Sequence, residues 1–199
     1  MNLLARQQSL RGRRDEPPPA PPVDLATFSR WAERQEGRYE LVRGEVVMMV
    51  QVTRRHALVV SRVAASLLRQ LDPDRFHLSI AEFGVTTGAG LRFPDLLVDA
   101  AGRPLDERAT DAPLFVAEVL SPSTIAVDMV EKPAEYGALP SLAAYAVFSQ
   151  DEPRVWFWER ETAGWPDAPR TVEAGTIALP AIGASLLLEE IYRGLGPAS

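Results

Sequence analysis

The sequence predicts a mixed α/β fold, α+β in its layout, in which helices cover one central sheet. The run from Leu114 to Leu120 is almost entirely apolar and β-branched, which is typical of a strand buried on both faces. From Arg54 to Leu71, apolar residues recur at the spacing of an amphipathic helix. The predicted elements from Arg54 to Phe148 follow the order helix, strand, strand, strand, helix, strand. We therefore expect the apolar strand in the middle of the sheet.

The composition is that of an ordinary globular protein. At 199 residues the chain suits one domain that buries roughly 70 % of its unfolded surface on folding. Its net charge of −6 gives no general attraction to nucleic acid, so any such binding has to use a local patch. The lack of cysteine excludes disulfides and thiolate metal sites and leaves the redox compartment open.

The sequence contains no segment that predicts membrane insertion or secretion. It has no run of about 18 apolar residues, the length needed for a transmembrane helix. The N-terminal arginines are not followed by the continuous apolar segment of a signal peptide. We therefore expect a cytoplasmic protein that does not enter a membrane.

Both ends of the chain are predicted to be tails. Residues 1–22 carry four arginines and then the run Pro17–Pro22, which favours an extended polyproline conformation. We expect a disordered tail there; a tether for nucleic acid is the alternative explanation of the arginines. The folded domain is predicted to span residues 23–193, and a second short tail to span 194–199.

A short helix and a β-hairpin are predicted to open the domain. Asp24 or Thr27 can cap the helix. The hairpin joins Tyr39–Val42 to Glu45–Val50 through a turn at Arg43-Gly44. Glu45 shares its side of the second strand with the apolar residues two and four positions further on, so it is an acid on an otherwise apolar face.

The helix predicted from Arg54 to Leu71 carries a histidine at the edge of its core-facing stripe. This residue, His56, lies in the first turn, where a histidine is more often a packing residue than a ligand, yet it is kept as a candidate. Three arginines recur every seven residues on the opposite side of the helix. A solvated helix face is the favoured explanation of this row, over a track for phosphates.

The next segment is predicted to be a hairpin that ends near an aspartate. Strands Phe76–Thr87 and Leu91–Val98 flank a glycine-rich turn. Pro94 removes a hydrogen-bond donor from the second strand, which indicates an edge or a bulge. Asp95 follows this irregularity and precedes a buried run. The polar stretch 102–113 is predicted to be a loop.

Glu118 lies inside the apolar strand, where an unpaired carboxylate is costly to desolvate. A cation, a metal ion or a strong hydrogen-bond donor has to meet it. A structural ion pair with a neighbouring arginine and a metal site both satisfy this requirement, and the residues alone leave the two open.

The remaining elements are short. A helix over Asp128–Leu139 places Lys132 and Tyr136 on one face, because they are four residues apart. Strands are predicted over 143–148 and 154–158, outer strands within 171–179, and a helical turn over 186–192.

Several of these segments carry motifs that are specific in combination. They are Tyr39–Glu45, His56, Pro94-Asp95, Glu118–Thr124, Asp128, Lys132, Tyr136, Leu139–Leu142 and Pro180–Gly183. With them the chain, over roughly residues 24–192, resembles the Uma-type family, which is grouped with the PD-(D/E)XK nucleases. The resemblance implies a restriction-endonuclease-like αβββαβ core with an N-terminal β-hairpin and extra C-terminal strands.

The resemblance also implies a metal site. Asp95 and Glu118 would bind a divalent ion, Mg²⁺ or Mn²⁺, because hard carboxylate oxygens suit such ions. The superfamily pattern has a lysine two residues after the glutamate, where this chain has Leu120. Lys132, from the following helix, is the candidate replacement. Glu45 and His56 match family positions and are expected to play supporting catalytic roles.

The residue after Lys132 affects the direction of its side chain. Pro133 directly follows Lys132, and proline disfavours the α conformation at the residue before it. The lysine is therefore expected at a helix start rather than in mid-turn.

Two functions from different classes follow. One is a metal-dependent endonuclease that hydrolyses DNA. The alternative is a catalytically inactive nuclease-like module for DNA binding or interaction; a metal-free acid–base hydrolase that uses Asp95 and Glu118 is weaker. DNA is the expected partner, and a homodimer is expected because cutting both strands needs two sites. The aromatic segment Val155–Trp158, with Leu58 and Val59, is the predicted contact surface.

Overall fold

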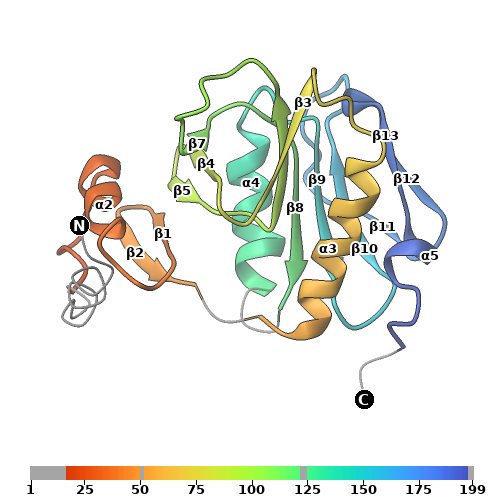
Figure 1. The fold of residues 1–199 in the computed structure, drawn as a ribbon, viewed down its shortest axis with the longest axis horizontal. Coiled ribbons are helices and arrows are strands. Elements are labelled where there is room, and N and C mark those ends of the chain that lie inside the picture. Colours follow the sequence, from red (N-terminus) through yellow and green to blue (C-terminus); the bar gives the residue numbers. More distant parts are fainter. Residues whose placement is uncertain (1–16, 50–51, 122–124, 197–199) are drawn as a thin grey trace, which may run out of the picture. The chain divides into compact units, whose positions relative to one another are not determined.

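The computed structural model describes residues 17–49, 52–121 and 125–196, which fall into two compact units. The N-terminal unit holds residues 17–49 and 89–91, and the main unit holds the others (Figure 1). Residues 1–16 and 197–199 of the predicted tails lie outside the described residues, while residues 17–22 form neither helix nor strand. The extent of the domain, 23–193, stays a prediction.

The N-terminal unit contains the predicted helix and hairpin. Helix α2 (Leu25–Ala32) is capped by Asp24, whose Oδ1 accepts a hydrogen bond of 2.8 Å from the Thr27 backbone N–H. Strands β1 (Tyr39–Val42) and β2 (Glu45–Met48) pair in antiparallel fashion, as predicted. Arg43 and Gly44 both have positive φ angles, 51° and 82°, which matches a tight hairpin turn.

Strand β5 (Gly90–Arg92) pairs with β1 and depends on a glycine. Gly90 has a φ angle of 142°, and a Cβ atom there would collide with the carbonyl oxygen of Leu41. Only glycine therefore permits this close approach of the two backbones.

The main unit is organised around a six-stranded sheet in the order β11-β10-β9-β8-β6-β3. Its strands are β3 (Phe76–Ile80), β6 (Leu96–Ala100), β8 (Pro113–Leu120), β9 (Ala144–Ser149), β10 (Val155–Glu159) and β11 (Arg170–Val172). Strand β8 runs antiparallel to β6 and parallel to β9. The apolar strand is thus in the interior of the sheet, as its sequence predicted.

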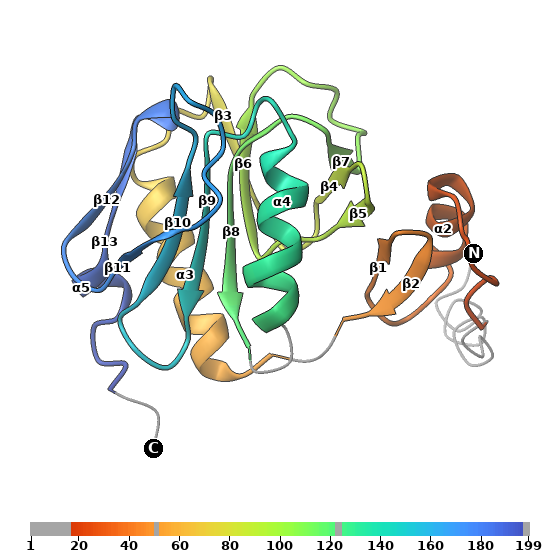
Figure 2. The same cartoon turned by 180° about the vertical axis from the view of Figure 1, so that it is seen from behind.

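Helices α3 (Arg54–Leu68) and α4 (Lys132–Gly137) cover opposite faces of this sheet (Figures 1 and 2). Side chains of β8 alternate between the two faces. Phe115, Ala117 and Val119 pack in the cluster that holds the buried residues of α3, whereas Val116 packs with Tyr136 of α4. The succession α3, β3, β6, β8, α4, β9 is the predicted αβββαβ core.

The segment between α3 and β8 differs from the prediction. The two long strands predicted over 76–98 are four: β3, β4 (Gly84–Thr87), β5 and β6. Strand β3 pairs with β6, and β4 pairs in parallel with β7 (Ala109–Thr110), a strand inside the predicted loop. Pro94 lies between β5 and β6, because a residue without an N–H ends a strand more readily than it interrupts one.

The C-terminal segment also differs. Strands β12 (Thr176–Leu179) and β13 (Ala184–Leu187) form a hairpin around a short 3₁₀ turn, η2 (Pro180–Ile182). The terminal helix α5 therefore spans only Leu188–Ile191, not 186–192. Leu186 pairs with Ile177 and is fully buried, so tertiary packing outweighed the helical pattern.

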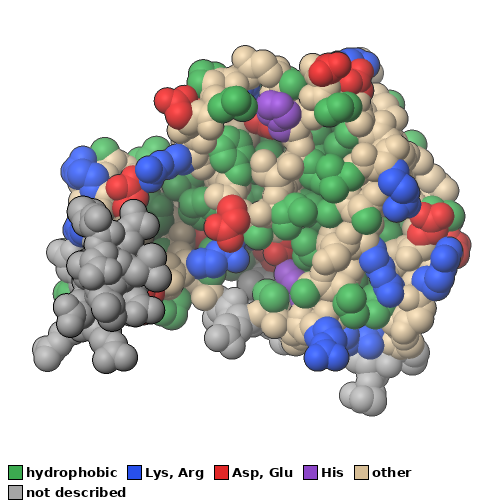
Figure 3. All heavy atoms as spheres, in the orientation of Figure 1, with side chains coloured by type: hydrophobic (Ala, Val, Ile, Leu, Met, Phe, Trp, Pro, Cys, Tyr) green, Lys and Arg blue, Asp and Glu red, His purple; other side chains and the backbone are tan. Residues whose placement is uncertain are grey.

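In the arginine row of α3, Arg69 is solvated, with 61 % of its side chain exposed, whereas Arg55 and Arg62 bind carbonyl oxygens. Arg55 donates hydrogen bonds to the carbonyl oxygens of Gln150, Asp151 and Gly196, and Arg62 donates one of 2.9 Å to that of Ile191. Figure 3 shows basic side chains scattered among acidic and apolar ones on this face of the molecule. In the part of the chain that the structure describes, no helix has the length and apolar character needed to cross a membrane.

Candidate active site

Asp95 and Glu118 come together because their strands are neighbours. Leu96 of β6 stands opposite Ala117 of β8, so the residues beside this pair meet at the same place on the sheet. The Asp95 N–H donates a hydrogen bond of 3.3 Å to Glu118 Oε2. In return, the Val119 N–H donates one of 2.7 Å to Asp95 Oδ2. Backbone groups thus fix both carboxylates.

Lys132 comes to this pair of carboxylates from helix α4. Its Nζ lies 2.6 Å from Glu118 Oε1, a charge-assisted hydrogen bond. It also lies 2.9 Å from Asp128 Oδ1, in an ion pair one helical turn away along the same helix. All three side chains are buried: Glu118 is 6 % exposed, Lys132 is 7 % exposed and Asp128 is 3 % exposed.

Burial raises the pKa of Glu118 well above its ordinary value, because the charged carboxylate is desolvated. The Lys132 ammonium lowers this pKa, whereas the charges of Asp128 and Asp95 raise it further. Two buried carboxylates, Glu118 and Asp128, therefore contact one ammonium, with Asp95 beside Glu118, and an additional cation would relieve the repulsion among these acids.

The helix that carries Lys132 contains an irregular turn. Residues Val127–Glu131 form a π-helical turn, η1, which leads directly into α4 at Lys132. Proline lacks an N–H, and its ring clashes with the carbonyl four residues earlier in a regular helix. The wider π turn just before Pro133 accommodates it, and such turns often mark functional sites. The expected helix start at Lys132 is wrong: the π turn runs without a break into α4, and Lys132 keeps the α conformation, with φ −61° and ψ −38°.

His56 joins the cluster from α3. The N-cap Thr53 holds the first turn, because its hydroxyl oxygen accepts a hydrogen bond of 3.1 Å from the His56 N–H. The His56 Nε2 atom lies 3.1 Å from Asp95 Oδ2, so the ring orients that carboxylate. Its Nδ1 atom is buried and has no hydrogen-bond partner among the described residues.

Four of the five predicted site residues therefore meet in the main unit: Asp95, Glu118, Lys132 and His56. Glu45 lies on the N-terminal unit, exposed at the start of β2, and its supporting role stays a prediction. The acid buried in that hairpin is Glu40. The alternation predicted an acid among apolar residues at Glu45, but its neighbours Val47 and Met48 are exposed too.

Sequence reasoning assigned no role to several residues that the structure brings to the cluster. The Tyr136 hydroxyl lies 3.4 Å from Glu118 Oε1, and the Tyr145 hydroxyl donates a hydrogen bond of 3.1 Å to the Asp128 carbonyl oxygen. Arg92, which is 2 % exposed, binds Glu135 of α4 through two hydrogen bonds of 2.7 and 2.8 Å. The spacing of four residues from Asp128 to Lys132 is the signal that could have found Asp128, whereas Tyr145 and Arg92 lie on other elements and have no such local signal.

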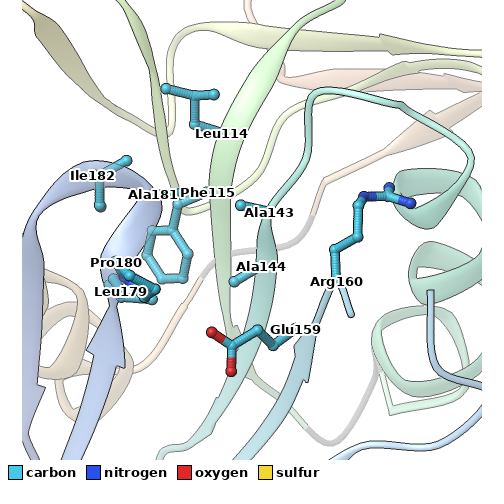
Figure 4. Close-up of a pocket in the computed structure, with 10 residues that line it drawn as sticks. All are labelled: Leu114, Phe115, Ala143, Ala144, Glu159, Arg160, Leu179, Pro180, Ala181 and Ile182. Atoms are coloured by element: carbon cyan, nitrogen blue, oxygen red, sulfur yellow. The ribbon is translucent and has the colours of Figure 1, made fainter. Parts of the chain in front are cut away.

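The pocket drawn in Figure 4 is not part of this cluster. Its volume is about 150 Å³, and it is lined by Leu114, Phe115, Ala143, Ala144 and Glu159, among others. Leu114 and Ala144 lie where β8 and β9 begin, whereas Glu118 lies toward the end of β8. The two places are thus at different ends of the same strands.

The donor atoms fit a hard divalent ion that keeps water ligands. The described residues hold no cluster of three or more His, Cys, Asp or Glu side chains arranged to bind a metal ion. Mg²⁺, however, is often bound by one or two carboxylates and completes its shell with water and substrate phosphate. Within the described residues, the contacts of the Asp95 side chain all use Oδ2, and the side chain is 20 % exposed, so Oδ1 suits a ligand. Asp95 and Glu118 would hold the ion.

Comparisons with known proteins bear on the family and the fold of this chain. The model of the Uma2 family, described as "Putative restriction endonuclease", matches residues 25–189. A protein of Synechocystis sp. named "Uncharacterized protein slr1290" is 26 % identical over 182 residues, which are 89 % of this chain and 95 % of that protein. The crystal structure of a protein from Anabaena variabilis, titled "a putative nuclease belonging to DUF820", superposes with a TM-score of 0.66. The match covers 86 % of this chain and 98 % of that one at 16 % identity, and it shows a shared fold.

Proposed function

This chain belongs to the Uma2 family, described as "Putative restriction endonuclease", and we propose that it is an endonuclease that hydrolyses DNA phosphodiester bonds with Mg²⁺ or Mn²⁺. The observation that carries the proposal is the meeting of Asp95, Glu118 and Lys132 in one cluster. Two carboxylates and an ammonium are the groups that such a reaction needs.

Asp95 and Glu118 supply the metal-binding oxygens from two strands whose backbones fix them. The chemistry that a divalent ion supplies there is neutralisation of charge on the phosphoryl oxygens and a lower pKa for bound water. Because Val119 and His56 hold Asp95, and Lys132 and Tyr136 hold Glu118, little reorganisation is needed when substrate binds.

Lys132 supplies the positive charge on the helix side. Its ammonium is close enough to Glu118 to orient a water molecule for attack on the phosphorus, or to stabilise the negative charge that develops. In both roles it acts on the transition state more than on bound substrate.

A second candidate is a nuclease-like module that binds DNA or a partner without cutting. The net charge of −6 favours it, and so does the use of the α3 arginines for internal hydrogen bonds rather than for phosphates.

A paired measurement tests the proposal. Calorimetric titration with Mg²⁺ and Mn²⁺ should show binding by the wild type and none by Asp95→Asn. The same proteins are incubated with a supercoiled plasmid, which reports single cuts whatever the target sequence. Metal binding with metal-dependent nicking supports the endonuclease. Metal binding without nicking favours the inactive module, and no difference between the two proteins refutes the site.

A further inference from the structure

Lys132 is the only lysine in this chain. The 21 basic side chains of the sequence comprise one lysine and 20 arginines. Arginine thus serves every other basic position, including the buried Arg92 that binds Glu135 through its planar fork. A compact ammonium is used only where it meets Glu118 and Asp128. This position needs what arginine cannot give, which is a point charge that fits between two carboxylates.

Asp128 also contacts this ammonium, through an ion pair in which its Oδ1 atom makes no hydrogen bond among the described residues. It is 2 % exposed, and it stands one helical turn before Lys132, 2.9 Å from Nζ. Its backbone is held separately, because the Tyr145 hydroxyl donates to its carbonyl oxygen. The π turn Val127–Glu131 begins just before it, so the local winding of the helix sets how Asp128 and Lys132 face each other.

Glu118 alone would be a poor anchor for the lysine under the proposed function. Its Oε1 atom already meets both Lys132 and Tyr136, and its carboxylate is the one that would also serve a metal ion. An ammonium shared with a metal ligand needs a second, independent partner to keep its place. In this cluster the carboxylate of Asp128 can be that partner, because Asp128 is not a proposed metal ligand.

We infer that Asp128 is a positioning residue, whose carboxylate fixes the Lys132 ammonium beside Glu118. Asp128 touches neither DNA nor metal in this proposal; it acts through Lys132. The catalytic consequence rests on the proposed endonuclease function, whereas the placement of the ammonium does not.

The single lysine allows a test that needs no activity. In protein labelled with ¹⁵N-lysine, the side-chain ammonium gives one Nζ signal, which we expect to be protected from exchange in the wild type. Asp128→Asn, which keeps the size and removes the charge, should shift this signal and speed the acylation of Lys132, read by mass spectrometry, by ~10-fold. Asp99→Asn is the matched control, because Asp99 is an equally buried aspartate, on β6. It should leave both readouts unchanged.

The activity measurement separates positioning from mere structure. Asp128→Asn should lower kcat for plasmid cleavage by ~10- to 100-fold, since a displaced catalytic group costs that much, with KM nearly unchanged. In a Lys132→Ala background the same substitution should cost almost nothing more, because the two residues act as one unit. A full additional loss in that background would mean that Asp128 acts independently of Lys132.

The outcomes are separable. If the wild type does not cut DNA, the endonuclease proposal fails, and the Nζ signal still decides the role of Asp128. An Nζ signal and acylation rate in Asp128→Asn equal to wild type would overturn the inference. Should Asp128→Asn fail to fold, the ¹³C carboxyl resonance of Asp128 is compared between wild type and Lys132→Ala; an unmoved resonance overturns it as well.

Discussion

Asp95 shows how one residue depends on several elements at once. Its N–H meets Glu118 of β8, its Oδ2 accepts the Val119 N–H, and the same oxygen faces His56 of α3. A carboxylate held in this way keeps its orientation whether or not a ligand is present. Its second oxygen, Oδ1, is then the atom offered to a ligand.

The first prediction concerns metal binding by Asp95. Millimolar Mg²⁺ or Mn²⁺ should raise the melting temperature of the wild type, because an ion at about 100 times its Kd stabilises the folded state by about 2.7 kcal/mol. Asp95→Asn should lose this shift. Differential scanning fluorimetry with and without the ion measures it, and Asp99→Asn, on the strand that follows Asp95, serves as control. An Asp95→Asn protein that gains as much as wild type contradicts the assignment.

The second prediction concerns Lys132. Lys132→Ala should lower the cleavage rate by ~100-fold or more while DNA and metal affinity stay nearly unchanged, because the ammonium acts in the transition state. Lys132→Arg should not restore the rate fully, since a planar guanidinium cannot replace a compact charge. Single-turnover cleavage and DNA-binding titrations measure the two effects. Equal rates for Lys132→Ala and wild type would remove the lysine from the mechanism.

At the scale of elements, helix α4 is fixed to the site by a second ion pair. Arg92 donates two hydrogen bonds to Glu135 of α4, and Lys132 of the same helix donates one to Glu118. The two contacts prevent the helix from rolling on the sheet. The aromatic contacts of Tyr136 with Tyr145, and of Tyr145 with Trp158, pack the same face.

The third prediction follows from this clamp. Glu135→Gln should destabilise the fold by about 3 kcal/mol, because it leaves the buried Arg92 charge without its bidentate partner. Glu131→Gln is the control on the same helix: it lies 3.8 Å from Arg92, is 35 % exposed, and should cost less than about 1 kcal/mol. Urea unfolding of both variants measures the difference. Equal losses would mean that the bidentate contact has no special weight.

At the scale of the whole molecule, the expected homodimer needs a different surface from the one that the sequence suggested. Val155, Phe157 and Trp158 are buried, because β10 lies between β9 and β11 rather than at an edge. Val59 is buried as well, while Leu58 is 38 % exposed. The predicted contact surface at Val155–Trp158 is therefore wrong, because the sheet order buries most of this strand in the core.

The fourth prediction is that the protein is nevertheless a dimer. Cutting both strands of a duplex needs two active sites, and symmetric dimers are the commonest way to supply them. Light scattering at tens of micromolar should therefore give twice the mass of the 21.8 kDa chain. A monomer mass, with or without metal and DNA, would restrict the proposed reaction to single-strand nicks.

The sequence by itself determined the elements whose signals are local. The hairpin turn at Arg43-Gly44, the cap at Asp24 and the buried strand that holds Glu118 were all readable, because turn chemistry, capping and unbroken apolar runs depend on neighbours in the chain. The four members of the cluster were brought together through a family resemblance. Such a resemblance reflects tertiary contacts that a single sequence does not display.

Tertiary structure alone decided which partner each charged group meets. The register of β6 against β8 joined Asp95 to Glu118, and the packing of α4 on the sheet brought Lys132 to Glu118. The same kind of distant contact made Leu186 a strand residue and gave the α3 arginines carbonyl partners far along the chain. These pairings depend on packing between segments that are remote in sequence, and no local pattern encodes them.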